Sequence, residues 1–189
     1  MKITKAQSLA NRAHIVKTAS ELFRERGYDG VGVAELMAAA GFTQGGFYKH
    51  FGSKADLMAE AAATSLSQSM ASTESLDLRQ FINFYVSRDH RDGRSEGCTL
   101  AALCGDAARQ SGEFKATFAE GIERTLAKLQ QKYLADEQAP RDVARAKMID
   151  MLAHAIGAVI LSRACPDDAP LADEILEVCR AEMTASLPQ

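Results

Sequence analysis

The stretch Ala40-Gly41-Phe42-Thr43-Gln44-Gly45-Gly46-Phe47-Tyr48-Lys49-His50-Phe51-Gly52-Ser53-Lys54 (AGFTQGGFYKHFGSK) places four glycines among aromatic and polar residues. Gly41 falls where a preceding helix must end, a position that often needs positive φ. Thr43 is a suitable N-cap, because its hydroxyl can accept from a free backbone N–H of the next helix. We therefore predict a tight turn followed by a short helix over Gln44–His50.

Within this short helix, two glycines need an explanation. Phe47 and Phe51 are four residues apart, so they share one face that can pack inward. Gly45 and Gly46 each lower helix stability by about 1 kcal/mol relative to alanine. Either the missing side chains allow close approach to a phosphate backbone or a base edge, or they allow a tight crossing with another helix.

The end of the stretch predicts a further helix. Ser53 and Asp56 have the spacing of an N-cap and its third helical residue. Lys54 then lies in the first turn, where the helix dipole gives a structural lysine no advantage, so we expect it to reach a phosphate. A helix, a tight glycine turn and a short second helix describe a helix-turn-helix, which places its second helix in the major groove of DNA.

Outside this stretch, the chain is dominated by helical patterns. Of its 189 residues 47% are hydrophobic and four are prolines, and apolar residues recur at helical spacing. The sequence predicts an all-α protein with helices over Ser8–Gly27, Val33–Ala40, Gln44–His50, from Ser53 toward Met70, Leu78–Arg88, Thr99–Gln110, Glu113–Leu134, Arg141–Arg163 and Ala169–Ala185.

Charge and composition exclude several classes of protein. Residues 1–58 carry eight basic against five acidic side chains, while the remainder carries fourteen against twenty, so only the basic N-terminal part favours nucleic acid. We see no signal peptide or membrane span and expect a cytoplasmic protein. Neither the four cysteines nor the histidines have the spacing of a metal site, and we expect no cofactor. An enzyme is the disfavoured alternative, because no catalytic set or phosphate loop is present.

The run from Gly30 to Leu57, GVGVAELMAAAGFTQGGFYKHFGSKADL, closely resembles the DNA-binding signature of the TetR/AcrR family of transcriptional regulators. The resemblance implies about nine helices: a three-helix helix-turn-helix DNA-binding domain over residues 1–53 and a larger helical ligand-binding and dimerisation domain over 54–189. It further implies a homodimer on a palindromic operator of double-stranded DNA, most often a repressor, released by a small-molecule effector.

Carried over by position, the resemblance assigns DNA-contacting residues. Tyr48 and His50 resemble phosphate contacts, and Gln44 and Lys49 are our choices for reading base edges. The full set comprises Thr43, Gln44, Gly45, Tyr48, Lys49, His50 and Lys54. Gly32 departs from the family pattern, which often has a capping Thr or Ser there.

The last two predicted helices suggest a dimer interface. The helix over Arg141–Arg163 is apolar on more than one face and therefore needs two partners. One partner is the domain's own core, and the other is a second subunit related by a two-fold axis; burial within one subunit is the alternative. The expected interface residues are Leu152, Ile156, Val159, Ile160, Ile175, Cys179 and Met183.

Apolar residues on the middle helices suggest a ligand pocket, although such a stripe is more often simply core. The candidates are Phe81, Phe84, Tyr85, Cys98, Leu103, Phe118, Met148 and Met151, which favour an apolar effector. Cys98 begins a predicted helix, so an electrophile- or redox-sensing thiol is a second hypothesis, set against a small buried hydrophobe. A helix-turn-helix protein that organises DNA without a ligand is a further alternative.

Overall fold

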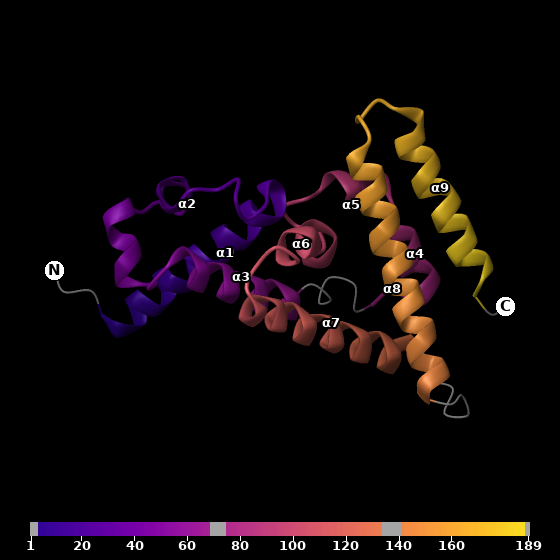
Figure 1. Cartoon of the computed structure of the whole chain (residues 1–189), viewed down its shortest axis with the longest axis horizontal. Helices are drawn as coiled ribbons and strands as arrows, with labels where there is room; N and C mark the ends of the chain where they lie inside the picture. Colours follow the sequence, from indigo (N-terminus) through magenta and orange to yellow (C-terminus); the bar gives the residue numbers. More distant parts are fainter. Residues whose placement is uncertain (1–3, 69–74, 134–140, 188–189) are drawn as a thin grey trace.

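The computed structural model describes residues 4–68, 75–133 and 141–187, and in this part of the chain the fold is all-α, with nine α-helices, one short 3₁₀ helix and no strand (Figure 1). The prediction of an all-α fold of about nine helices is confirmed. The elements are α1 (Lys5–Arg26), α2 (Val33–Ala39), η1 (Gln44–Lys49), α3 (Lys54–Gln68), α4 (Leu78–Tyr85), α5 (Arg88–Asp92), α6 (Thr99–Ala107), α7 (Gly112–Tyr133), α8 (Arg141–Ala164) and α9 (Pro170–Ala185).

The N-terminal helices begin and end at residues that the sequence marks. The Thr4 hydroxyl accepts a hydrogen bond from the Gln7 N–H and caps α1. Gly27 follows α1 with φ +76°, and Gly41 follows α2 with φ +78°. Both values lie in the left-handed region that only glycine adopts readily, so these two glycines end their helices for a conformational reason.

Two hydrophobic clusters hold the helices together. The first joins the N-terminal elements α1, α2, η1 and α3 to α6 and α7, through residues such as Phe23, Leu57 and Phe118. The second joins α4, α6, α7, α8 and α9 around residues such as Met148 and Leu176. In Figure 1, α6 and α7 accordingly lie between the N-terminal helices and the α8–α9 pair. The predicted division between residues 53 and 54 stays a prediction.

Two predicted helices end three residues earlier than expected, and one helix was missed. The helix predicted over Thr99–Gln110 ends at Ala107. The pattern over Leu78–Arg88 gives a helix that ends at Tyr85, because Val86 leaves helical geometry with ψ +60°. Ser87 then caps the separate helix α5 by accepting from the His90 N–H at 3.2 Å. The predicted helix ends at Met70 and Leu134 lie outside the described residues.

Within the described ranges, none of the helices combines the length and apolar character needed to cross a membrane.

Candidate nucleic-acid interface

Two phenylalanines anchor η1 to the N-terminal helices. Phe47 is fully buried and Phe51 nearly so, and their ring centroids lie 5.5 Å apart. The Arg12 guanidinium of α1 lies 4.6 Å from the centroid of the Phe51 ring, and its Nε donates to the His50 carbonyl at 3.3 Å. Arg12 also pairs with Glu60 of α3. η1 is therefore fixed by aromatic packing and by cation–π and hydrogen-bond contacts to α1.

The residues predicted to contact DNA lie on the exposed side of this short helix. Thr43, Gln44, Gly45 and Lys49 are all exposed to solvent. The Tyr48 side chain is 73% exposed. His50 is half-buried, with its ring 6.5 Å from that of Phe42. The structure thus brings these polar groups together on a surface that a phosphate backbone or a base edge can reach, and their roles stay predictions.

The type of helix and the role of the Thr43 hydroxyl differ from what we expected. Gln44–Lys49 forms a 3₁₀ helix, whereas the short helix predicted over Gln44–His50 was reasoned with α-helical spacing. Thr43 does occupy the N-cap position, but its side chain makes no capping hydrogen bond. Its carbonyl instead accepts from the Gly46 N–H at 2.9 Å, the i→i+3 bond of a 3₁₀ turn. Two consecutive glycines weaken the preference for the α-helix and favour this short, tighter form.

Neither glycine inside η1 is required by the packing of the chain. A Cβ added at Gly45 would meet no atom of the described residues within 4 Å. At Gly46 the nearest atom, Met37 Cε, would lie 3.7 Å away, an ordinary van der Waals distance. Neither glycine has a positive φ. The alternative of a tight helix crossing is therefore not supported at either position. For Gly45, this leaves close approach to an external molecule as the explanation.

The start of α3 carries the predicted lysine. The Ser53 hydroxyl accepts from the Asp56 N–H at 3.1 Å, so the predicted N-cap is confirmed. Lys54 Nζ donates to the Tyr28 carbonyl at 2.6 Å. An ammonium group has three donors, so two are left for an anion while the bond to Tyr28 holds the side chain in place.

Gly32 is the N-cap of α2 and offers no side-chain hydrogen bond, as its departure from the family pattern implies.

The predicted ligand residues are divided between the two hydrophobic clusters. Phe81, Tyr85 and Met148 belong to the second cluster, and Met151 packs against it. Leu103 and Phe118 belong instead to the first cluster. Cys98 contacts both clusters, and Phe84 is 47% exposed. Most of the set therefore contributes to the core, with Cys98 at the junction.

Buried polar groups gather around Cys98. Cys98 is the N-cap of α6, and its N–H donates to His90 Nε2 at 3.2 Å, while His90 Nδ1 lies 2.7 Å from the Tyr85 carbonyl. The Tyr85 hydroxyl is buried and has no hydrogen-bond partner among the residues that the structure describes. Burial, followed by the nearby Cys98, raises the pKa of Tyr85. Burial raises the pKa of the Cys104 thiol to about 11, which makes it a poor nucleophile at neutral pH.

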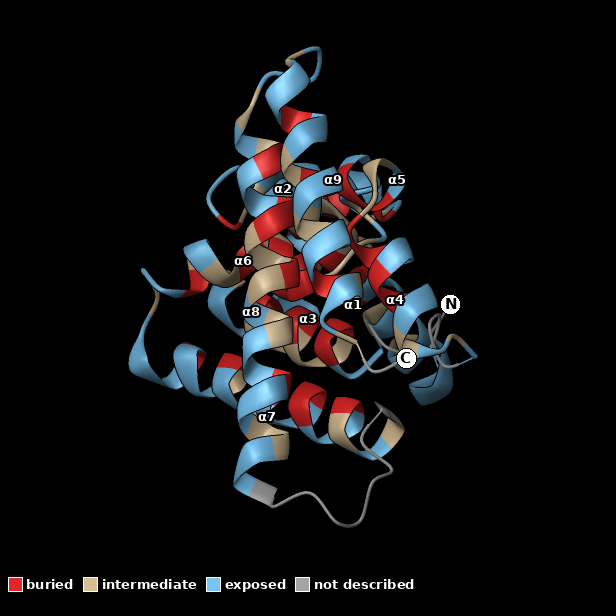
Figure 2. Ribbon diagram, turned by 90° about the vertical axis from the view of Figure 1, so that its right-hand side faces the viewer, coloured by how far each residue is buried: buried red, intermediate tan, exposed pale blue. Residues whose placement is uncertain are grey.

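The predicted dimer residues differ in their exposure. Val159 and Met183 are buried within the chain, with 0% and 5% of their surface exposed, whereas Ile160 is 40% exposed. Leu152, Ile156, Ile175 and Cys179 are half-buried. Five exposed apolar residues on α8 and α9 were not predicted: Val143, Ile149, Leu161, Leu171 and Val178, each 46–58% exposed. Figure 2 shows exposed and half-buried segments along the face of α8 turned to the viewer.

Comparison with known sequences places the N-terminal part of the chain among bacterial regulators. Residues 15–61 match the family model described as bacterial regulatory proteins of the tetR family. The chain is 35% identical to the helix-turn-helix transcriptional regulator YdgC of Bacillus subtilis over 79 residues, which are 42% of the chain. It is 46% identical to the repressor DhaR of a Mycobacterium species over 43 residues, which are 23% of the chain. These matches span only 40% and 22% of the two relatives' lengths.

Comparison with solved structures extends the similarity to the whole fold. A TetR-family regulator from Cytophaga hutchinsonii superposes with a TM-score of 0.73 at 18% identity, over 99% of this chain and 98% of that one. At this identity the match shows the shared fold. The helix-turn-helix sequence and the arrangement of the remaining helices therefore point to the same family.

Proposed function

The chain belongs to the TetR/AcrR family of helix-turn-helix transcriptional regulators, and we propose that it represses transcription by binding a palindromic DNA operator as a homodimer. The proposal rests above all on the exposed surface of η1, where polar side chains surround a glycine that the chain's own packing does not require. In a helix-turn-helix, this second helix is the element that enters the major groove. Contact with chromosomal DNA also implies a cytoplasmic location.

The experiment that tests DNA binding is selection of genomic fragments by the purified protein. A regulator of this kind enriches a short inverted repeat, because two-fold symmetry of the dimer is mirrored in the half-sites. Recovery of all fragments in proportion to their input would contradict sequence-specific binding. The genes beside an enriched site then identify what the protein regulates.

Substitutions separate the proposed base readers from the proposed phosphate contact. Lys54→Ala should weaken binding to operator and random DNA alike and make affinity less salt-dependent, since one phosphate contact is lost. Gln44→Ala and Lys49→Ala should each reduce preference at particular base pairs by about 1–3 kcal/mol. Equal losses on operator and random DNA for Gln44→Ala and Lys49→Ala would refute their assignment as base readers.

For the dimer, we propose an interface on the outer faces of α8 and α9. Exposed apolar side chains on both helices support it, because a second subunit that packs there would remove this apolar surface from water. Leu161→Glu and Val178→Glu should each shift the molecular mass in light scattering from dimer to monomer without unfolding the chain. A monomeric wild type would contradict the proposed dimer, and variants that stay dimeric would contradict this interface.

For the effector, we propose a small apolar or electrophilic molecule that reaches the core at Cys98. Cys98 is half-buried and lies where the two hydrophobic clusters meet, beside the buried Tyr85 hydroxyl. An alkylating agent should then weaken operator binding by the wild type but leave Cys98→Ser unaffected. If both proteins respond equally, or neither does, thiol sensing at Cys98 is wrong, and an apolar, non-reactive effector is the remaining form of the proposal.

A regulator without an effector is the second candidate. A thermal-shift screen distinguishes the two, because a ligand that binds the native state raises its melting temperature. Compounds that both stabilise the protein and weaken operator binding support the ligand-responsive regulator. Stabilising compounds that leave operator affinity unchanged favour the alternative.

A further inference from the structure

A polar pocket lies where the DNA-binding helices meet the rest of the protein. It has a volume of about 450 Å³ and lies between the end of α1, the α5–α6 loop, α6 and α8. Arg24 comes from α1, Arg94 from the loop and Arg163 from α8, while Ala102 and Ile160 supply apolar wall. This pocket shares none of the eight predicted ligand residues, so it is separate from the proposed effector site.

Three arginines of this pocket lack a carboxylate partner. Arg24 Nε donates to the Ser95 carbonyl at 2.7 Å, and Arg163 donates to the carbonyls of His90 and Arg91 at 3.0 and 2.8 Å. Within the described ranges, no carboxylate lies within ion-pair distance of Arg24, Arg94 or Arg163. Carbonyl acceptors orient the Arg24 and Arg163 guanidinium groups without neutralising them, and only Arg24 has acidic side chains, Glu21 and Glu96, acting on it at longer range among the described residues.

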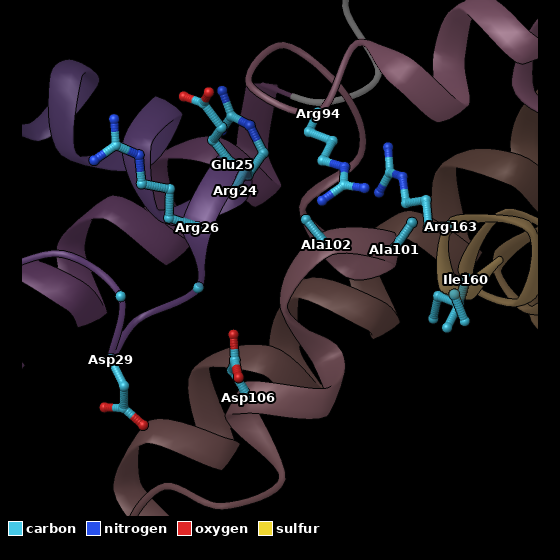
Figure 3. A pocket seen from close by; sticks show the side chains of 13 residues that line it. Arg24, Glu25, Arg26, Asp29, Arg94, Ala101, Ala102, Asp106, Ile160 and Arg163 are labelled. Atoms are coloured by element: carbon cyan, nitrogen blue, oxygen red, sulfur yellow. The ribbon is translucent and has the colours of Figure 1, made fainter. Parts of the chain in front are cut away.

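The arrangement places like charges together. Figure 3 shows the guanidinium groups of Arg94 and Arg163 turned toward each other above the α6 residues Ala101 and Ala102. Burial lowers the pKa of Arg163, and the charge of Arg94 lowers it further. Burial likewise lowers the pKa of Arg24, against the opposite effect of Glu21. Such a cluster is disfavoured by itself and favourable once an anion occupies the space between the charges.

The acidic residues that line the pocket do not neutralise these arginines. Asp106 pairs with Arg109, outside the pocket lining, at 2.7 Å. Glu25 and Asp29 are exposed, and in Figure 3 Asp29 and Asp106 lie at the end opposite Arg94, with Asp29 directed away from it. The part of the pocket at Arg94 and Arg163 is therefore cationic with an apolar wall beside it. Asp29 and Asp106 lie at the other end, and Figure 3 shows Glu25 beside Arg24.

We propose that this pocket binds a small organic anion, a carboxylate or phosphate group with a compact apolar body, held by Arg24, Arg94 and Arg163. The planar, bidentate donor geometry of guanidinium suits both oxyanions. Residues of the DNA-binding helix α1 and of α8 would both contact the bound anion. The inference does not depend on DNA binding or on the effector proposed above.

Thermal unfolding with matched probes tests the proposal. Benzoate carries the anion and an apolar ring, benzamide is its neutral counterpart, and inorganic phosphate is the anion without the ring. At constant ionic strength, benzoate at ten times its Kd should raise the melting temperature by about 3–6 °C. Benzamide should give no shift, and phosphate a smaller one.

Arg94→Gln is the informative variant, because the Arg94 side chain makes no hydrogen bond or ion pair among the described residues. Loss of the Arg94 charge also removes its repulsion with Arg163. It should melt at or above the wild-type temperature without ligand, and its benzoate shift should fall to the benzamide level. Arg79→Gln, the same charge change at an exposed position of α4, should keep the full shift. No benzoate shift in the wild type, equal shifts with benzamide, or an unchanged shift in Arg94→Gln would each overturn the proposal. The assay contains no DNA, so these outcomes leave the proposed repressor function untouched.

Discussion

Replacing Gly45 by alanine separates what the fold needs from what DNA binding needs. The added methyl would meet no atom within 4 Å, and the backbone of Gly45 is not in the left-handed region. Alanine also restricts the unfolded chain, so Gly45→Ala should raise the free energy of unfolding by about 0.4–1 kcal/mol. A folding role for Gly45 predicts the opposite sign.

The same substitution should weaken binding to DNA. If the backbone of η1 approaches the major groove closely at Gly45, a methyl group there meets the DNA, and an overpacked contact costs about 1–3 kcal/mol. Operator affinity should then fall by about 5- to 150-fold. The salt dependence of binding should stay the same, because the change removes no charge.

Two measurements on one protein preparation check this prediction: urea unfolding and titration of a labelled operator. Gly105→Ala is the matched control, because a Cβ there also meets no atom within 4 Å and Gly105 lies in α6. It should stabilise the fold without changing operator affinity. Wild-type affinity in Gly45→Ala would falsify the close-approach explanation, and a lower free energy of unfolding would show that the structural reasoning is wrong.

Three further substitutions test the fold. Arg91 is 1% exposed and donates to Ser162 Oγ at 2.9 Å and to Asp167 Oδ1 at 2.8 Å, so Arg91→Ala should lower the free energy of unfolding in urea by about 3 kcal/mol. Gly121→Ala would bring a methyl to 2.6 Å from a Leu66 methyl group and should destabilise by about 1–3 kcal/mol, whereas an unchanged midpoint would contradict the tight α3–α7 contact. Burial lowers the pKa of His90, so the unfolded state binds the proton more readily, and the free energy of unfolding should fall as pH drops below about 6.5. In urea titrations from pH 7 to 5, His90→Gln should make the free energy of unfolding depend less on pH.

Local signals in the sequence predicted most of the helices and the packing of the short helix η1. The turn at Gly41 and the burial of Phe47 and Phe51 follow from residue type and spacing, and the structure confirms them. The 3₁₀ form of η1 was missed, because the choice between two helix types depends on a small energy difference that spacing does not reveal. The separate helix α5 was missed because Ser87 continues the helical pattern of α4 while acting as a cap.

Sites made from distant segments were beyond the reach of sequence reasoning. Arg24, Arg94 and Arg163 belong to segments about 70 residues apart along the chain, and each alone resembles a solvated arginine. Only the packing of α1, α6 and α8 brings them to one pocket. Similarly, periodicity indicated that α8 is apolar on two sides, but it did not distinguish Val159, which the chain buries, from Ile160, which is 40% exposed.

Open space around a glycine does not by itself mark a binding surface. Gly105 and Gly157 are as open as Gly45, and both lie within α-helices, where glycine is unfavourable. What distinguishes Gly45 is its position between Gln44 and the exposed Tyr48, on an element whose opposite side is fixed by buried aromatic rings. A rigid element that presents polar side chains beside bare backbone is suited to contact a large, close partner, whereas the polar neighbours of Gly105, Asp106 and Arg109, pair with each other. The comparison of Gly45→Ala with Gly105→Ala therefore tests position and chemistry together, with the stability gain held constant between them.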